Sequence, residues 1–265
     1  MKGEYLEIGS QKFTSRLFVG TGKYPSDDVC KDALIASGAE LVTLRIMLHS
    51  EMINNPNPPC LGELTAEYLF NSGKVSLLPN TAGCYTAQEA INVALNSRKV
   101  LNTPFIKLEV IGEKTTLFPD AENLLIAARY LVKEGFVVLP YTSDDVVVAK
   151  KLQDVGCSAI MPLAAPIGSG LGIQNPLNLE LILKAVNIPV IVDAGVGTAS
   201  DATVAMELGC DGILINTAIA CSKDPILMAR SMNFAVQAGK MSYLAGRIPK
   251  RKYAIPSTVV NTPEG

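Results

Sequence analysis

Short apolar runs alternate with helical segments along most of this chain of 265 residues. Most of these runs are apolar almost throughout, which is typical of strands that are covered on both faces. The segments between them show helical periodicity, as in residues 121–134. The predicted strands are residues 17–19, 41–44, 75–78, 105–111, 136–141, 159–161, 190–193 and 212–215. Strands that alternate with helices in this way predict a parallel sheet.

Signals at the helix boundaries support the alternation. Thr86 and Glu89 have the spacing of a capping box, and Asn175 stands before Pro176 as an N-cap stands before a proline in the first turn. Eight strands over roughly 200–250 residues match a closed (β/α)8 barrel. The alternative is a doubly wound open sheet, but no Gly-x-Gly-x-x-Gly follows the first strand. We predict a single (β/α)8 TIM barrel domain over residues 1–265, with a mobile loop at 54–59 and a tail that is disordered from about residue 254.

Composition limits the classes of partner and site. The formal net charge of −2 gives no reason to expect a nucleic-acid partner. No run approaches the roughly 18 apolar residues that span a bilayer, and no targeting segment is present at the start of the chain. The six cysteines have neither disulfide nor metal-ligand spacing. We therefore expect a cytoplasmic protein with reduced cysteines, no bound metal and no membrane partner.

The fourth predicted strand carries a lysine and a glutamate, Lys107 and Glu109, on one face. The apolar residues Ile106, Leu108 and Val110 occupy the other face. In a barrel, an inward-facing pair near the carboxyl end of a strand faces the active-site mouth. Burial there is expected to lower the pKa of the lysine and make its amine a nucleophile for carbonyl groups. The alternative is a lysine on the outer face, under a helix, with its ammonium group reaching water.

Glycine-rich loops follow the last three predicted strands. Gly168 lies after the sixth strand, Gly195 after the seventh, and Asn216 and Thr217 after the eighth. The loops after the seventh and eighth strands form the recurrent phosphate site of such barrels. With the loop after the sixth strand on the same rim, they predict a phosphorylated small-molecule substrate. If so, a bulky replacement of Gly195 should weaken substrate binding and leave the fold intact. Asp193 would face the same mouth as Lys107, or alternatively cap the helix that follows it.

Several longer motifs together resemble thiazole synthase of bacterial and plastid thiamine biosynthesis. The resemblance runs from about residue 6 to residue 253. It is carried by Leu-Pro-Asn-Thr-Ala-Gly-Cys-Tyr-Thr-Ala at 78–87, Ile-Lys-Leu-Glu-Val-Ile-Gly at 106–112, Val-Val-Leu-Pro-Tyr-Thr at 137–142, Ala-Pro-Ile-Gly-Ser-Gly at 165–170, Val-Asp-Ala-Gly at 192–195, Asn-Thr-Ala at 216–218 and Leu-Ala-Gly-Arg-Ile-Pro at 244–249. Residues 44–49 depart from the family's pattern, and Ala164 replaces its usual glycine.

The resemblance implies a specific reaction. Such enzymes condense 1-deoxy-D-xylulose 5-phosphate, dehydroglycine and sulfur from the thiocarboxylated C-terminus of a ubiquitin-like sulfur-carrier protein. It implies that Lys107 forms an imine with the sugar ketone, and that Glu109 and Asp193 move protons. The positions that match its substrate contacts are Gly168, Ala194, Gly195, Asn216 and Thr217.

The resemblance also implies partners, and two other functions stay open. The implied partners are the carrier protein and a separate enzyme that produces dehydroglycine, and we expect a homo-oligomer. No metal or redox cofactor is implied. The first alternative function is a lysine-dependent aldolase that cleaves a phosphosugar. The second is a non-catalytic scaffold that docks the sulfur carrier.

Overall fold

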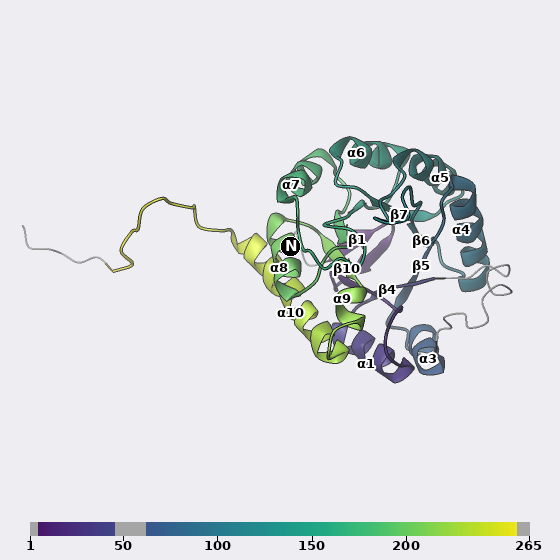
Figure 1. Cartoon of the computed structure of the whole chain (residues 1–265), viewed down its shortest axis with the longest axis horizontal. Helices are drawn as coiled ribbons and strands as arrows, with labels where there is room; N and C mark the ends of the chain where they lie inside the picture. Colours follow the sequence, from purple (N-terminus) through teal and green to yellow (C-terminus); the bar gives the residue numbers. More distant parts are fainter. Residues whose placement is uncertain (1–4, 46–61, 259–265) are drawn as a thin grey trace, which may run out of the picture.

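Eight parallel strands form a nearly closed barrel in the computed structural model, which describes residues 5–45 and 62–258 (Figure 1). The strands neighbour one another in the order β8-β7-β6-β5-β4-β3-β10-β9, and parallel bridges between Ile160 and Val190 and between Leu163 and Asp193 join the two ends. Their bounds are β3 Leu17–Gly20, β4 Leu41–Arg45, β5 Ser76–Asn80, β6 Phe105–Leu108, β7 Val137–Thr142, β8 Met161–Pro162, β9 Ile191–Asp193 and β10 Gly212–Ile215. The predicted barrel is confirmed, and the open-sheet alternative is wrong.

Helices surround the strands on the outside of the barrel (Figure 1). They are α1 Asp27–Ser37, α3 Glu63–Asn71, α4 Ala87–Leu101, α5 Ala121–Lys133, α6 Val146–Val155, α7 Pro176–Ala185, α8 Ala199–Leu208, α9 Thr217–Ala220 and α10 Pro225–Ala245. The predicted capping box of Thr86 and Glu89 begins α4, and Asn175 caps α7 ahead of Pro176. Local capping therefore sets where these helices begin, as the sequence indicated.

The strands of the barrel bury apolar side chains on both of their faces. On β6, Phe105 points into the barrel and packs with residues such as Leu78 and Leu139. Ile106 and Leu108 point outward into the layer between strands and helices. This alternation confirms the predicted division of the strand into two faces, and it places Lys107 on the inner face with Phe105.

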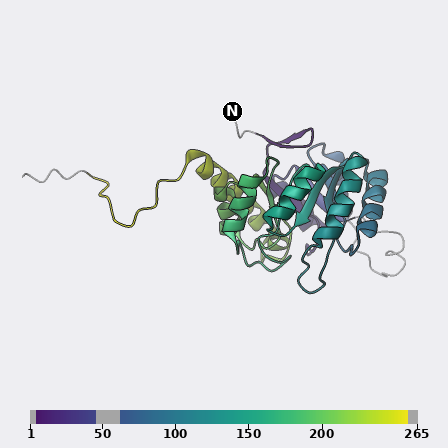
Figure 2. The ribbon, with the colours of Figure 1, turned by 90° about the horizontal axis from the view of Figure 1, so that it is seen from above.

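An N-terminal hairpin closes one end of the barrel, and the sequence analysis did not predict it. Strands β1 (Leu6–Ile8) and β2 (Gln11–Phe13) pair in antiparallel fashion. Figure 2 shows this hairpin at one end of the barrel. The ring of Phe13 lies edge-on to Phe18 and to Phe105, with centroids 6.0 and 6.2 Å apart. The hairpin therefore extends the inner core at the amino-terminal end of the strands, opposite their carboxyl ends.

The loop predicted at 54–59 and the atypical segment 46–49 lie outside the described residues. Residues 246–258 extend away from the barrel, exposed and without helix or strand (Figure 1); disorder from about residue 254 stays a prediction. Within the described ranges, no helix combines the length and apolar character that a membrane crossing requires.

Candidate active site

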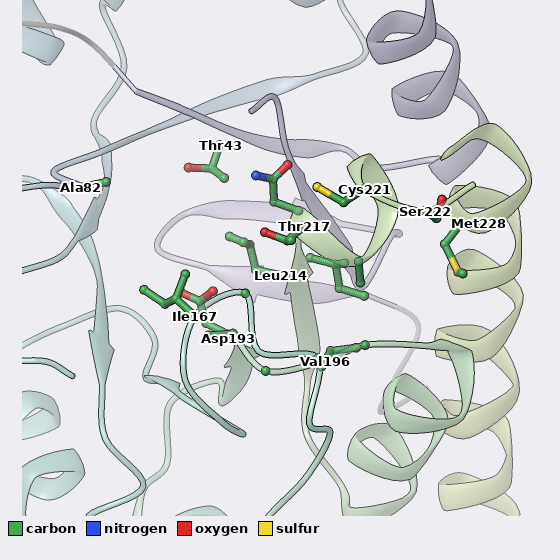
Figure 3. Close-up of a pocket in the computed structure, with 18 of the residues that line it drawn as sticks. Thr43, Ala82, Ile167, Asp193, Val196, Leu214, Thr217, Cys221, Ser222 and Met228 are labelled. Atoms are coloured by element: carbon green, nitrogen blue, oxygen red, sulfur yellow. The ribbon is translucent and has the colours of Figure 1, made fainter. Parts of the chain in front are cut away.

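A cavity of about 610 Å³ opens at the carboxyl ends of the strands (Figure 3). Side chains from β4, β5 and β6 line it, together with the loops that follow β8, β9 and β10. All of the residues predicted to be catalytic or to bind substrate line this one cavity, namely Lys107, Glu109, Gly168, Asp193, Ala194, Gly195, Asn216 and Thr217. The structure thus brings together groups that are more than a hundred residues apart in the chain.

The amine of Lys107 lies between two carboxylates in this cavity. Its Nζ is 3.0 Å from Glu109 Oε1 and 2.7 Å from Asp193 Oδ2. The three residues are 6%, 5% and 4% exposed, respectively. The alternative of an outward-facing Lys107 is therefore wrong. Asp193 is not a helix cap either, because α8 begins at the N-cap Thr198, whose N–H donates to the carboxylate of Asp201 (3.1 Å).

The two carboxylates change the expected protonation of the lysine. Burial alone lowers the pKa of Lys107, but the charges of Asp193 and Glu109 together outweigh burial and raise that pKa above its ordinary value. The expectation of a lowered pKa is therefore wrong for the resting site. Burial raises the pKa of Asp193, against the opposing effect of the Lys107 charge. A raised pKa makes the Asp193 carboxylate a better proton acceptor than an ordinary aspartate.

Glu109 is held at the cavity by Thr81. Strand β6 ends at Leu108, whereas the sequence analysis extended it to residue 111. Beyond Leu108 the main chain leaves the ladder, because the Glu109 N–H donates to Thr81 Oγ1 and the Thr81 hydroxyl donates to the Glu109 carbonyl, both at 2.7 Å. Thr81 is fully buried. It was missed as a functional residue, although it belongs to the motif at 78–87.

The glycines of the rim differ in the room around them. Gly195 has φ +81°, and a Cβ added there would come within 2.3 Å of the Ala165 nitrogen. A bulky replacement would therefore displace the loop, so the expectation of an intact fold is wrong. Gly168 has φ +74°, and the same Cβ would meet only Thr217 Oγ1, at 3.9 Å. Ala194 has φ +71°, a left-handed conformation that non-glycine residues rarely adopt and that clusters at functional sites.

Asn216 lines the cavity and also ties two strands together. With its amide nitrogen turned toward the loop after β3, it donates to the carbonyls of Gly22 (2.9 Å) and Gly20 (3.1 Å). A Cβ on Gly20 would come within 2.9 Å of the Asn216 side chain, so the close approach requires glycine there. Asn216 thus fixes the carboxyl end of β10, from which Thr217 begins α9.

Further residues of the cavity were missed by the sequence analysis. Thr43 and Asn80 stand on the wall formed by β4 and β5, and Lys223 stands on the loop between α9 and α10. Thr43 lies near the end of a predicted strand, Asn80 belongs to the motif at 78–87, and Lys223 has no comparable signal. Position at a strand end alone does not distinguish a wall residue from a turn residue.

Comparisons with known proteins agree along nearly the whole chain. The family model described as "Thiazole biosynthesis protein ThiG" matches residues 7–259. The thiazole synthase of Sorangium cellulosum is 57% identical over 258 residues, which cover 97% of this chain and 96% of that protein. The thiazole synthase of Aquifex aeolicus is 53% identical, with 97% and 94% covered.

Solved structures agree with these relatives. The Amycolatopsis orientalis BexX/CysO complex superposes with a TM-score of 0.84 at 32% identity, covering 94% of this chain and 98% of that one. The 3-hexulose-6-phosphate synthase of Salmonella typhimurium, at 14% identity and a TM-score of 0.57, covers 84% of this chain and 98% of that one, and shares the fold alone.

Proposed function

Since this chain belongs to the ThiG family of thiazole synthases, enzymes of thiamine biosynthesis, we propose the reaction in detail. The enzyme condenses 1-deoxy-D-xylulose 5-phosphate, dehydroglycine and carrier-bound sulfur into a thiazole phosphate carboxylate, through an imine at Lys107. The observation that carries this proposal is the buried Lys107 amine, held 3.0 Å from Glu109 and 2.7 Å from Asp193 in a cavity that is open to substrate.

Imine formation begins with a proton transfer inside the site. Asp193 takes a proton from the Lys107 ammonium group, and the neutral amine adds to the ketone carbon of the phosphosugar. The ketone oxygen leaves as water, with the returned proton and one proton from the amine. The product is a protonated imine, so the positive charge of the site is unchanged. The raised pKa of Asp193 supports its role as the temporary acceptor.

The next step is a tautomerisation of the sugar. A protonated imine withdraws electrons and makes the neighbouring C–H bond acidic. Glu109 Oε1 lies 3.0 Å from the nitrogen of Lys107 and is therefore within reach of that carbon's proton. Glu109 would take this proton and return it elsewhere on the sugar, and Glu109 and Asp193 would then serve sulfur addition as proton carriers.

The phosphate is proposed to lie on the glycine-rich side of the cavity. Gly168, Ala194, Gly195 and Thr217 all line that side. The main chain at the first three has positive φ, which turns the loops at the cavity. Loops in these places form the recurrent anion site of such barrels. Asn216 supports this site from behind by fixing the end of β10 to the loop after β3.

Partners follow from the sulfur chemistry. We propose that the C-terminus of a thiocarboxylated ubiquitin-like carrier enters the cavity mouth; the solved BexX/CysO complex of a 32% identical relative supports a docked protein on this fold. Dehydroglycine would come from a separate enzyme. Homo-oligomerisation and a cytoplasmic location stay predictions.

Borohydride trapping tests the proposal. The chain is incubated with the phosphosugar alone, reduced, digested and mapped by mass, and we expect the adduct at Lys107 and none in Lys107→Ala. Lys223→Ala is the matched control, because Lys223 lines the same cavity, and it should keep the adduct. Cleavage of the sugar without carrier would favour the aldolase, and the absence of any adduct would favour the scaffold.

A further inference from the structure

Thr43 and Asn80 form an uncharged polar pair on the wall of the cavity, and the proposed reaction assigns no role to this pair. The Asn80 amide nitrogen donates to Thr43 Oγ1 over 3.1 Å, and the Ala82 N–H donates to Asn80 Oδ1 over 3.2 Å. Thr43 is 5% exposed. Figure 3 shows Thr43 and Ala82 on the opposite side of the cavity from Asp193 and Val196.

The pair has two hydrogen-bond donors that are not used within the pair. The Thr43 oxygen accepts from Asn80, so its own O–H remains to donate, and the Asn80 amide has a second N–H. Within residues 5–45 and 62–258, neither of these donors has a protein acceptor. The Thr43 hydroxyl is buried and the Asn80 amide is half-buried at the cavity wall. A buried donor without an acceptor is costly, which points to an acceptor inside the cavity.

A purely structural role does not account for the pair. Strands β4 and β5 already pair in register from Leu41–Ser76 to Arg45–Asn80. The Thr43 carbonyl is held separately, by the N–H (3.2 Å) and hydroxyl (3.4 Å) of Thr21. The two strands are therefore joined by their main chains, without the side-chain bond.

The position and charge of the pair limit its ligand. Asn80 is the ladder partner of Lys107 across β5 and β6, so the pair lies beside the reacting amine and across the cavity from the glycine-rich side. Neutral donors suit a neutral oxygen, whereas a phosphate favours cations and helix N-termini. We propose that Thr43 and Asn80 form a subsite that binds a hydroxyl group on the carbon chain of the substrate. This inference rests on the proposed function. It means that this pair makes the enzyme prefer a ketone whose carbon chain carries hydroxyl groups.

Deoxy analogues test the inference. The second-order rate of borohydride-trapped imine formation is measured for 1-deoxy-D-xylulose 5-phosphate and for two analogues, each lacking one chain hydroxyl. Wild type should prefer the parent over one analogue by roughly 3- to 10-fold, the worth of one neutral hydrogen bond. In Thr43→Val this preference should disappear, and Thr43→Ser should restore it.

The control is Thr103→Val, which removes a buried hydroxyl that donates to the Leu77 carbonyl (3.1 Å), outside the lining of this cavity, and should leave the preference unchanged. If Thr43→Val discriminates against both analogues as strongly as wild type, the subsite is overturned. If Thr43→Val does not fold, Asn80→Ala is measured with the same two outcomes. Failure of the proposed function is distinct, because wild type would then form no adduct with the parent sugar.

Discussion

Thr81 and Glu109 exchange two hydrogen bonds of 2.7 Å just beyond the end of β6, and this exchange sets where the glutamate stands. The Thr81 N–H also donates to the Lys107 carbonyl over 3.1 Å. One buried threonine therefore fixes the main chain at both Lys107 and Glu109. Strand β6 ends at Leu108, so the main chain of Glu109 has no neighbouring strand to bond with. Thr81 supplies those hydrogen bonds instead.

Thr81→Val should separate this positioning from general stability. The variant leaves the Glu109 N–H and carbonyl unsatisfied, and we expect a loss of about 1–3 kcal/mol in the free energy of unfolding. The rate of thiazole formation should fall by more than the loss of folded protein explains. Thr81→Ser should recover both the stability and the rate. Urea unfolding and product assays measure the two effects. Normal turnover in a folded Thr81→Val enzyme would exclude the positioning role.

Glu109→Gln should stop the proton shuttle and spare the imine. Wild type incubated with the phosphosugar in D2O should exchange the hydrogen beside the ketone, because the imine makes that carbon acidic. In the variant this exchange should slow by about 10²–10⁴-fold while borohydride trapping at Lys107 persists. Proton NMR of the sugar follows the exchange. An unchanged exchange rate would assign the proton transfer to another group.

The strand pattern sufficed to predict the barrel, because alternation of apolar runs and helices is a local property of the chain. Inner and outer faces also followed from the pattern, since Lys107 and Ile106 must point to opposite sides of β6. The N-terminal hairpin escaped prediction because β1 (Leu-Glu-Ile) and β2 (Gln-Lys-Phe) are short and interrupted by charged residues, whereas the similarly short β8 and β9 lie in apolar runs. Runs this short carry too few alternations to stand out, and their burial depends on distant strands.

Lys107, Glu109 and Asp193 were correctly predicted to face one cavity, but the direction of the Lys107 pKa shift was not predicted correctly. A pKa depends on distances between elements, and the 2.7 Å approach of Asp193 to Lys107 joins β9 to β6. No local pattern encodes that distance, so burial alone suggested the wrong direction for the pKa of Lys107. The crowding of Gly195 against Ala165 escaped prediction for the same reason.

Two glycine variants should distinguish binding from folding. Gly168→Ala places its new methyl 3.9 Å from Thr217 and bears only the strain of a positive φ, about 1 kcal/mol. It should fold and bind the phosphosugar more weakly, as measured by calorimetry. Gly195→Ala forces contact with the Ala165 main chain and should lower the melting temperature as well. Equal melting temperatures for both variants would contradict the crowding at Gly195.

Lys107→Met should make stability depend on pH. The lysine's raised pKa means that its stabilising charge is fully present at neutral pH and is lost only as pH rises through that pKa. Without the Lys107 charge, the negative charges of Glu109 and Asp193 are not neutralised. The free energy of unfolding of the variant should therefore fall by about 3–5 kcal/mol at pH 8. Without the opposing Lys107 charge, the pKa of Asp193 rises further above that of the unfolded chain, so the stability of the variant falls as pH rises.

The difference between the variant and wild type in the free energy of unfolding should therefore narrow between pH 8 and pH 5, as Asp193 takes up a proton. Urea unfolding at several pH values measures this difference in stability. The control is Lys223→Met, which replaces an exposed lysine. A gap that stays constant with pH would show that the two carboxylates do not repel each other in the folded state.

Asp193→Asn should change the pH profile of imine formation. In wild type the pKa of Lys107 is raised, so direct ionisation would make the rate climb roughly tenfold for each pH unit across pH 6.5–9.5. If Asp193 accepts the proton inside the site, the wild-type rate should instead be nearly flat, because the transfer conserves charge. The variant lacks this acceptor, and it also loses the charge that contributes more than Glu109 to raising the pKa of Lys107.

The variant should consequently be slow at pH 7 and recover as pH rises through the lysine's lowered pKa. It should stay folded, because Thr198, and not Asp193, caps α8 and the Lys107 ammonium group keeps its ion pair with Glu109. Trapping rates and thermal melts on both proteins, from pH 6.5 to 9.5, give the comparison. A wild-type rate that climbs tenfold per pH unit, or an Asp193→Asn profile that stays flat, would remove Asp193 as the acceptor and leave the proton of Lys107 to Glu109 or water.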